Sequence, residues 1–241
     1  MALTFDGSGD HLSKDTALFS APDDQNFYVS MVAWCRPDNK HQGTIIGADN
    51  GSSFADQFSI WCVSSGKFRA RYESSYITGS VAFNNGNTAW LHVAAVWQYS
   101  DRYLYVNGTQ DATNSNNRAS DVGNADNFYI GNNRLNERFE GAIAEAAAYN
   151  ASLTADEIAA LAAGYSPLFI RPDALVGYWP LGGTSYASDY SDIAAGNTLT
   201  ATGTPTEVDH PPIIYPSEPA LVTAAPSDTP DTLAAINYYY R

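Results

Sequence analysis

The sequence predicts an all-β protein, built as a two-sheet antiparallel sandwich with one short helix. Apolar and polar residues alternate with a period of two in one run after another, which is typical of strands with one buried face. Polar turn clusters such as ADNGSS, NNGN and NSNN separate these runs. The chain has 241 residues, of which 44% are hydrophobic and 13% aromatic, so it can bury a sizeable core.

The predicted strands follow one another along the chain. In FYVSMVAWC (27–35), every second residue from Val29 to Cys35 shares one apolar face. GKFRARYES (66–74) alternates Phe, Ala and Tyr with Lys, Arg, Arg and Glu, which indicates a half-buried strand. Asn107 and Gly108 supply the positive φ angles of a tight hairpin turn. The other candidate strands lie in DQFSIWCV (56–63), AWLHVAAVW (89–97), NFYIGNN (127–133) and FEGAIAEAAAYN (139–150).

One helix is predicted in SLTADEIAALAAG (152–164). Thr154 is its N-cap, and Glu157, three positions further on, suits a capping box. Ile158 and Leu161 make a short apolar stripe, and Gly164 ends the helix. The stripe is too narrow for a partner helix, so we expect the helix to pack on the sandwich.

The chain is strongly acidic, with 26 acidic against 12 basic residues and a formal charge of −14. Such a surface repels nucleic acid and anionic membranes, so neither is an expected partner. No charged leader followed by an apolar run opens the chain, so we expect synthesis in the cytoplasm without a signal peptide and no membrane insertion. Cys35 and Cys62 lie in predicted strands and are expected to be buried thiols, the alternatives being a disulfide or a metal site.

Several of these segments, in this order and spacing, resemble the LamG-like (concanavalin A-like, laminin-G-type) jelly roll. They are LTFDGSGDHL, FYVSMVAWCRPD, GTIIG, WLHVAAVWQYSDRYLYVNGTQDAT, FYIGNN and FEGAIAEAAAYNASLTADEI, all within residues 3–166. The resemblance implies one jelly-roll domain over residues 1–210, with 3–166 as its main body.

The segment DALVGYWPLGG (173–183) resembles the opening of such a module, yet it follows the helix. A sandwich tolerates a cut elsewhere in its chain if the termini lie close together. We therefore expect residues 174–204 to supply permuted edge strands of the same domain; the alternative is a small separate β appendage. Residues 211–241 hold six of the 12 prolines and should form an extended arm that works between chains, the alternative being a disordered tail.

Enzymes on this fold work with two carboxylates spaced on one strand as acid and nucleophile. Glu140 and Glu145 are five positions apart and so fall on opposite faces of a strand. The four histidines show no metal-ligand spacing. The sequence therefore predicts no enzyme activity and no catalytic residue.

The resemblance implies two kinds of binding site. Relatives often hold a structural calcium ion in acidic loops, and FDGSGD offers Asp6 and Asp10, with Glu145 as a third candidate ligand. The alternative is that these carboxylates are only solvated. A glycan site needs flat aromatic faces beside amides and carboxylates, and for most of the aromatic residues core packing is the alternative. The candidate aromatic residues are Trp61, Tyr72, Tyr76, Trp97, Tyr99 and Tyr103.

The sequence is therefore interpreted as a non-enzymatic structural or recognition protein of a tailed-phage virion, as capsid decoration, tail or fibre. LFIRPDALVGYWPLGG and HPPIIYP resemble segments of phage and prophage LamG-like proteins. The expected location is the virion, and the expected partners are other virion proteins or copies of itself, bound through the arm, and a host-surface glycan. The alternative is a bacterial surface or secreted carbohydrate-binding module.

Overall fold

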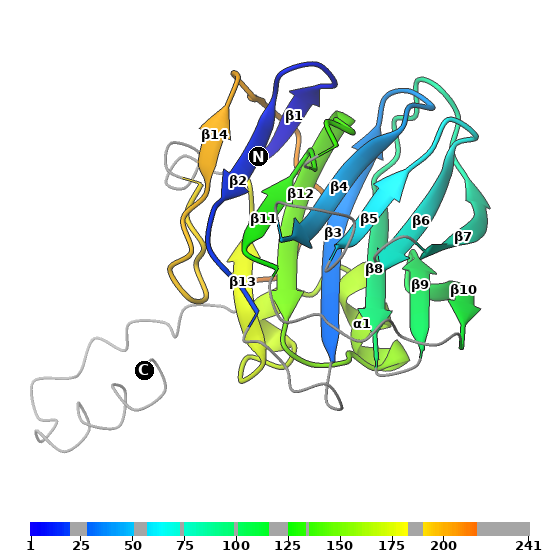
Figure 1. Cartoon of the computed structure of the whole chain (residues 1–241), viewed down its shortest axis with the longest axis vertical. Helices are drawn as coiled ribbons and strands as arrows, with labels where there is room; N and C mark the ends of the chain where they lie inside the picture. The colour runs from blue at the N-terminus through cyan, green and yellow to red at the C-terminus, as the bar shows by residue number, and fades with distance from the viewer. Residues whose placement is uncertain are drawn as a thin grey trace, which may run out of the picture.

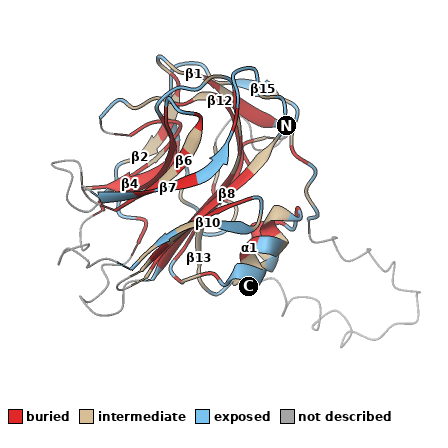
Figure 2. Cartoon of the chain, turned by 90° about the vertical axis from the view of Figure 1, so that its right-hand side faces the viewer, coloured by how far each residue is buried: buried red, intermediate tan, exposed pale blue. Residues whose placement is uncertain are grey.

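The computed structural model describes residues 1–19, 28–50, 57–72, 75–98, 101–115, 125–133, 135–182 and 190–215. Its strands form two packed antiparallel sheets, one of eight strands and one of seven (Figure 1). One short α-helix lies on the outside of the eight-stranded sheet (Figure 2). The predicted all-β sandwich is therefore confirmed.

Each sheet draws its strands from distant parts of the chain. The eight-stranded sheet has the order β10 (Thr109–Asn114), β9 (Arg102–Val106), β8 (Leu91–Trp97), β3 (Val29–Pro37), β12 (Glu140–Tyr149), β1 (Ala2–Asp6) and β15 (Thr206–Val208), and β13 (Leu175–Trp179) also pairs with β12. The seven-stranded sheet has the order β14 (Thr200–Thr202), β2 (His11–Lys14), β11 (Asn127–Ile130), β4 (Gly43–Asp49), β5 (Phe58–Cys62), β6 (Lys67–Tyr72) and β7 (Ser75–Ala82).

The long strand β12 brings the beginning of the chain beside the segment after the helix. β1 pairs with the first half of β12, and β13 pairs with the second half. Both run antiparallel to β12, so they lie end to end along it, and the end of β13 meets the beginning of β1. Residues 174–204 pair with strands of 3–166 through β13 and also through β14, which pairs with β2. A circular permutation whose new chain ends lay between β13 and β1 would give this arrangement. The permutation itself stays a prediction.

The two sheets enclose one apolar core between them (Figure 2). Strand pleating places alternate residues on the inner side, and the row that crosses the seven-stranded sheet there is entirely apolar. That row consists of Ala201, Leu12, Ile130, Ile46, Ile60, Ala70 and Ile77. Cys35 and Cys62 are buried free thiols in this core, as predicted, and burial raises the pKa of Cys62 to about 12.

Helix α1 (Ala155–Ala162) packs on the outer face of the eight-stranded sheet, as its narrow apolar stripe predicts (Figure 2). Ile158 and Leu161 are buried there against side chains of that sheet, including Tyr149. The predicted capping box is present, because Thr154 Oγ1 accepts from Glu157 N and the Glu157 carboxylate accepts from Thr154 N. Among the described helices, none is long and apolar enough to cross a membrane.

The C-terminal segment does not leave the sandwich at residue 211, where the arm was predicted to begin. Ile214 forms a parallel bridge with Tyr165, just before the 3-10 turn η1 (Pro167–Phe169), with backbone hydrogen bonds to both sides of it. Tyr215 OH donates to the buried Glu145 carboxylate at 2.7 Å. Residues 211–215 therefore belong to the folded body, and the rest of the predicted arm, 216–241, lies outside the described residues.

Candidate ligand-binding face of the seven-stranded sheet

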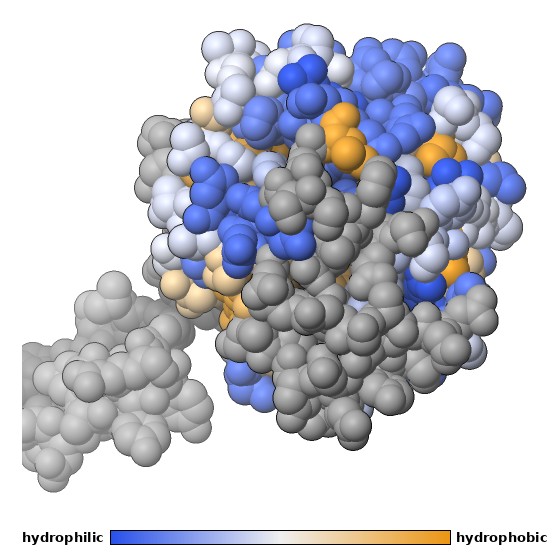
Figure 3. Space-filling view, viewed as in Figure 1, coloured by the Kyte–Doolittle hydropathy of each residue, from blue (hydrophilic) through white to orange (hydrophobic). Residues whose placement is uncertain are grey.

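The seven-stranded sheet has a polar outer face, opposite the apolar row that faces the core. The residues next to the inner row point outward because successive side chains alternate across a strand. The outer row consists of Thr200, Ser13, Tyr129, Gly47, Ser59, Arg71 and Tyr76. This face lies toward the viewer in Figures 1 and 3, where most of the described surface is hydrophilic. The pleat thus provides a polar surface on a rigid sheet.

Two aromatic rings and two guanidinium groups stack together on this face. Arg71 Cζ lies 4.5 Å from the centroid of the Trp61 ring, and Arg69 Cζ lies 4.2 Å from that of Tyr76. The two rings meet edge to face, with centroids 5.7 Å apart. Trp61 is 1% exposed and Tyr76 is 48% exposed, so the tyrosine is the ring open to a ligand and the tryptophan supports it from below. Arg69 Nε also donates to Thr78 Oγ1 at 2.9 Å, which fixes its position.

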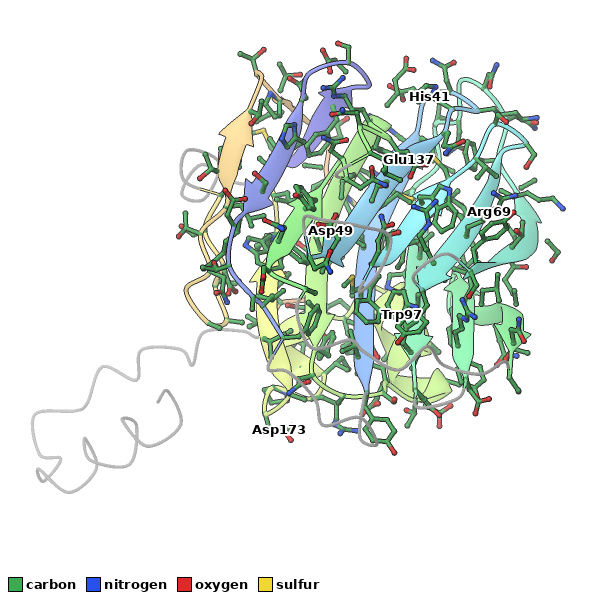
Figure 4. The ribbon with its side chains drawn as sticks, viewed as in Figure 1. His41, Asp49, Arg69, Trp97, Glu137 and Asp173 are labelled. Atoms are coloured by element: carbon green, nitrogen blue, oxygen red, sulfur yellow. The ribbon has the colours of Figure 1, made fainter. Side chains whose placement is uncertain are left out.

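A network of buried polar side chains adjoins this stack. Arg71 Nη1 donates to Gln57 Oε1 at 3.0 Å and lies 3.6 Å from Glu137 Oε2. Asn133 Nδ2 donates to the same Glu137 oxygen at 2.6 Å. Burial lowers the pKa of Arg71, and the nearby Glu137 carboxylate opposes that shift. Figure 4 shows Glu137 and Arg69 on the side of the seven-stranded sheet, with Asp49 at the end of β4.

Three buried polar groups of this face have no hydrogen-bond partner in the described part of the chain. They are Thr44 Oγ1, Ser59 Oγ and Trp61 Nε1. Thr44 lies opposite Trp61 across β4 and β5, and Ser59 lies two positions before Trp61, so the three groups are neighbours. An unpaired buried polar group costs about 1–3 kcal/mol. All three residues are fully buried, so a buried water is the partner they suit, and a ligand on the surface does not reach them.

Five of the six predicted glycan residues are described, and they lie in three environments. Tyr72 and Trp97 are core residues around Phe58, with ring centroids 5.1 Å and 5.6 Å from it. Tyr103 packs against the second apolar cluster, on the helix side of the eight-stranded sheet. Tyr99 lies outside the described residues. Only Trp61 and Tyr76 are placed on the polar outer face.

The predicted calcium ligands Asp6 and Asp10 lie in one turn, where their oxygens accept hydrogen bonds from the chain itself. Asp6 Oδ1 accepts from the backbone N–H groups of Ser8, Gly9 and Asp10, and Asp6 Oδ2 accepts from Ser8 Oγ. These hydrogen bonds hold the pKa of Asp6 far below its usual range, and the bond from the Ser8 hydroxyl has the largest effect. Asp10 Oδ1 accepts from Thr204 N at 2.7 Å and so ties this turn to the β14–β15 connection.

Glu145, the third predicted calcium ligand, lies apart from the other two. Asp6 is opposite Glu140, and Glu145 is five positions further along β12, which corresponds to about 16 Å. Its carboxylate is buried and accepts from Tyr178 OH at 2.5 Å and from Tyr215 OH. The three predicted ligands therefore do not converge, and among the described residues no three His, Cys, Asp or Glu side chains are grouped to hold a metal.

The alternation of GKFRARYES predicted that Arg69 and Arg71 face outward, but it gave no reason to link them to Trp61. Glu137 and Asn133 lie in the polar segment GNNRLNER (131–138). The link between these segments comes from strand order, since β5 lies between β4 and β6.

The family follows from comparison with known proteins. A model of the concanavalin A-like lectin/glucanases superfamily matches residues 6–159. The chain belongs to this superfamily. The match confirms the lectin-type jelly roll and carries nothing specific to phage proteins. A search of curated protein sequences finds no match.

Solved structures share the superfamily fold with this chain. A protein of Bacteroides ovatus proposed to bind carbohydrate has a TM-score of 0.62 and 19% identity, covering 88% of this chain and 61% of its own. The heptameric SAP-like pentraxin of Limulus polyphemus has a TM-score of 0.50 and 18% identity, covering 67% of this chain and 81% of its own. At these identities the likeness is one of fold.

Proposed function

We propose that this protein is a non-enzymatic module that binds a glycan on the outer face of its seven-stranded sheet. The observation that carries the proposal is the exposed Tyr76 ring, packed edge to face against Trp61 and beside Arg69, whose terminal NH₂ groups can donate to a ligand. A sugar ring presents an apolar C–H face for stacking and hydroxyl groups for hydrogen bonds, and this face offers partners for both.

The shared fold supports the proposal, since the Bacteroides ovatus protein described as a proposed carbohydrate binder has the same architecture. The carboxylates singled out in β12 favour a non-enzymatic role. Glu140 Oε1 accepts from Asn39 Nδ2 at 2.6 Å, whereas Glu145 is buried among tyrosines. Two carboxylates flanking one bond are what glycoside hydrolysis requires, and these two serve separate structural contacts.

The test is a glycan array followed by titration of each bound sugar against Tyr76→Ala and its matched control Tyr165→Ala. Tyr165 is 45% exposed, close to the 48% of Tyr76, but it lies beside the C-terminal segment at Ile214. Loss of a stacking ring should weaken binding by roughly tenfold in the first variant and leave the second unchanged. Absence of binding to any sugar at millimolar concentration, or equal losses in both variants, would overturn the proposal.

We further propose that this module works as a structural component of a tailed-phage virion. The support is in the sequence: its similarity to segments of phage LamG-like proteins, and the proline-rich residues 216–241, which suit contact with a neighbouring chain. Mass spectrometry of purified particles should find the protein in fixed copy number. Its recovery from the bacterial surface or medium, and not from particles, would favour the alternative of a bacterial carbohydrate-binding module.

A further inference from the structure

We propose that the glycan bound on this face is acidic, carrying carboxylate or sulfate groups that contact a cationic stripe on β6. This inference rests on the proposed glycan binding and names the class of sugar. The cationic stripe consists of Lys67, Arg69 and Arg71, which are three of only 12 basic residues in a chain of formal charge −14. They share the outer side because the alternate residues of β6, from Phe68 to Tyr72, face the core.

One further basic residue extends the stripe. A Cβ added to Gly66 would lie 2.9 Å from Lys40 Cε, so the Lys40 side chain reaches the turn that leads into β6. Positive groups from two separate segments thus lie on one part of a chain whose formal charge is −14.

The described carboxylates neutralise the charge of the stripe only in part. Arg71 has Glu137 as an ion-pair partner. Arg69 and Lys67 form no ion pair with any carboxylate of the described residues. Arg69 uses Nε on Thr78 and stacks on Tyr76, so its two terminal NH₂ groups remain as donors beside the exposed ring.

This arrangement suits an anion attached to a stacked sugar. A guanidinium group offers two parallel N–H donors that match the two oxygens of a carboxylate or sulfate. The acidic remainder of the surface repels anions in general, so such a ligand gains only where the local field is positive. A neutral sugar can accept hydrogen bonds from Arg69 through its hydroxyl groups, but it gains no ion pair from the guanidinium.

The test compares matched pairs of sugars that differ in charge. The pairs are sialyllactose against lactose, oligogalacturonate against its methyl ester, and dextran sulfate against dextran, each titrated at low and at moderate salt. The test variant is Arg69→Gln, and the control variant is Arg171→Gln. Arg171 lies 3.6 Å from Glu157 of α1, the helix that packs on the eight-stranded sheet. Arg69 is only partly exposed, so the melting temperature is used to check that both variants remain folded.

We expect at least one acidic sugar to bind about tenfold more tightly than its neutral partner. This difference in affinity should disappear in Arg69→Gln and remain in Arg171→Gln. Added salt should reduce it. The carboxylated and sulfated pairs show which anion is the source. Equal affinity for acidic and neutral members, with Arg69→Gln unchanged, would overturn the acidic ligand and leave glycan binding standing. Failure of every sugar to bind would overturn both proposals.

Discussion

Glu145 lies where β1 and β13 meet along β12, and replacing it by alanine tests how these parts are joined. Its carboxylate is 1% exposed and accepts from Tyr178 OH at 2.5 Å and Tyr215 OH at 2.7 Å, and His210 Nε2 lies 3.1 Å from it. The two tyrosines and the histidine come from β13 and from the segment after β15. One carboxylate therefore holds two segments that are far apart in the sequence.

The size of the effect follows from what each donor finds after the substitution. Tyr178 is fully buried; its oxygen keeps the hydrogen bond from Ser166 Oγ at 3.3 Å, but its O–H donor loses its acceptor, which costs about 1–3 kcal/mol. Tyr215 and His210 are partly exposed and can turn to water, so each loses about 1 kcal/mol. The sum, about 3–5 kcal/mol, agrees with the usual cost of breaking a buried charged pair. Glu145 has φ +53°, and alanine, which also carries a Cβ, neither relieves nor adds to that strain.

Urea denaturation of Glu145→Ala should therefore show a much lower midpoint with a similar slope. Tyr215→Phe removes one bond and is the graded control, with an expected loss of about 1 kcal/mol. A loss below about 1 kcal/mol in Glu145→Ala, or equal losses in the two variants, would refute the reasoning.

The same cluster sets an alkaline limit on stability. Burial, and then the charge of Glu145, raises the pKa of Tyr178 and Tyr215 above the ordinary value of 10.0. The unfolded chain loses these protons near pH 10, whereas the folded chain keeps them, so their contribution is full below pH 10 and falls as the pH rises further. Unfolding free energies from pH 8 to 11 check this, and a flat profile would contradict it.

Four further outcomes are expected. Burial lowers the pKa of His92 to about 3, so below pH 6.5 the unfolded chain binds a proton at this residue that the folded chain excludes. The melting temperature should therefore fall from pH 7 to pH 4, and it should fall less in His92→Phe. An equal dependence of melting temperature on pH in the two proteins would contradict this. Gly79→Ala should cost about 1–3 kcal/mol in urea. The new Cβ would lie 1.8 Å from an oxygen of Asp111, and moving that carboxylate breaks its hydrogen bonds with Ser80 and Val81; an unchanged midpoint would be the contrary result. If the FDGSGD turn binds calcium, excess chelator should lower the melting temperature; an unchanged melt, with no cation in elemental analysis, removes the site. A chain ending at residue 166 should be insoluble, because β12 and β2 lose β13 and β14; undiminished solubility and stability would count against one domain.

The elements could be predicted because their causes are local. The alternation in GKFRARYES predicts which residues lie on each face of β6, since successive side chains of a strand point to opposite faces. Asn107 and Gly108 have φ angles of 49° and 80°, as their tight turn requires. The capping box of α1 involves residues three positions apart. None of these features depends on where the rest of the chain lies.

The candidate site could be predicted only in part. Tyr72 and Tyr76 are four positions apart in adjacent strands, yet Tyr72 packs on Phe58 in the core and Tyr76 is exposed beside Arg69. Trp61 and Trp97 both alternate in apolar runs, and only Trp61 faces outward. The alternation of side chains along a strand shows which residues share a face, but it does not show which face the second sheet covers.

The sequence by itself determined several strands of both sheets, one tight turn, the helix and the resemblance to the family of this protein. Tertiary structure alone decided that Glu145, predicted as a metal ligand, is an internal acceptor for Tyr178 and Tyr215, which lie 33 and 70 residues further along the chain. It also brought Arg71 of β6 onto the Trp61 ring and within 3.6 Å of Glu137, which belongs to the loop after β11. The physical reason is that burial and charge pairing depend on contacts between distant segments, and these exist only once the two sheets have packed.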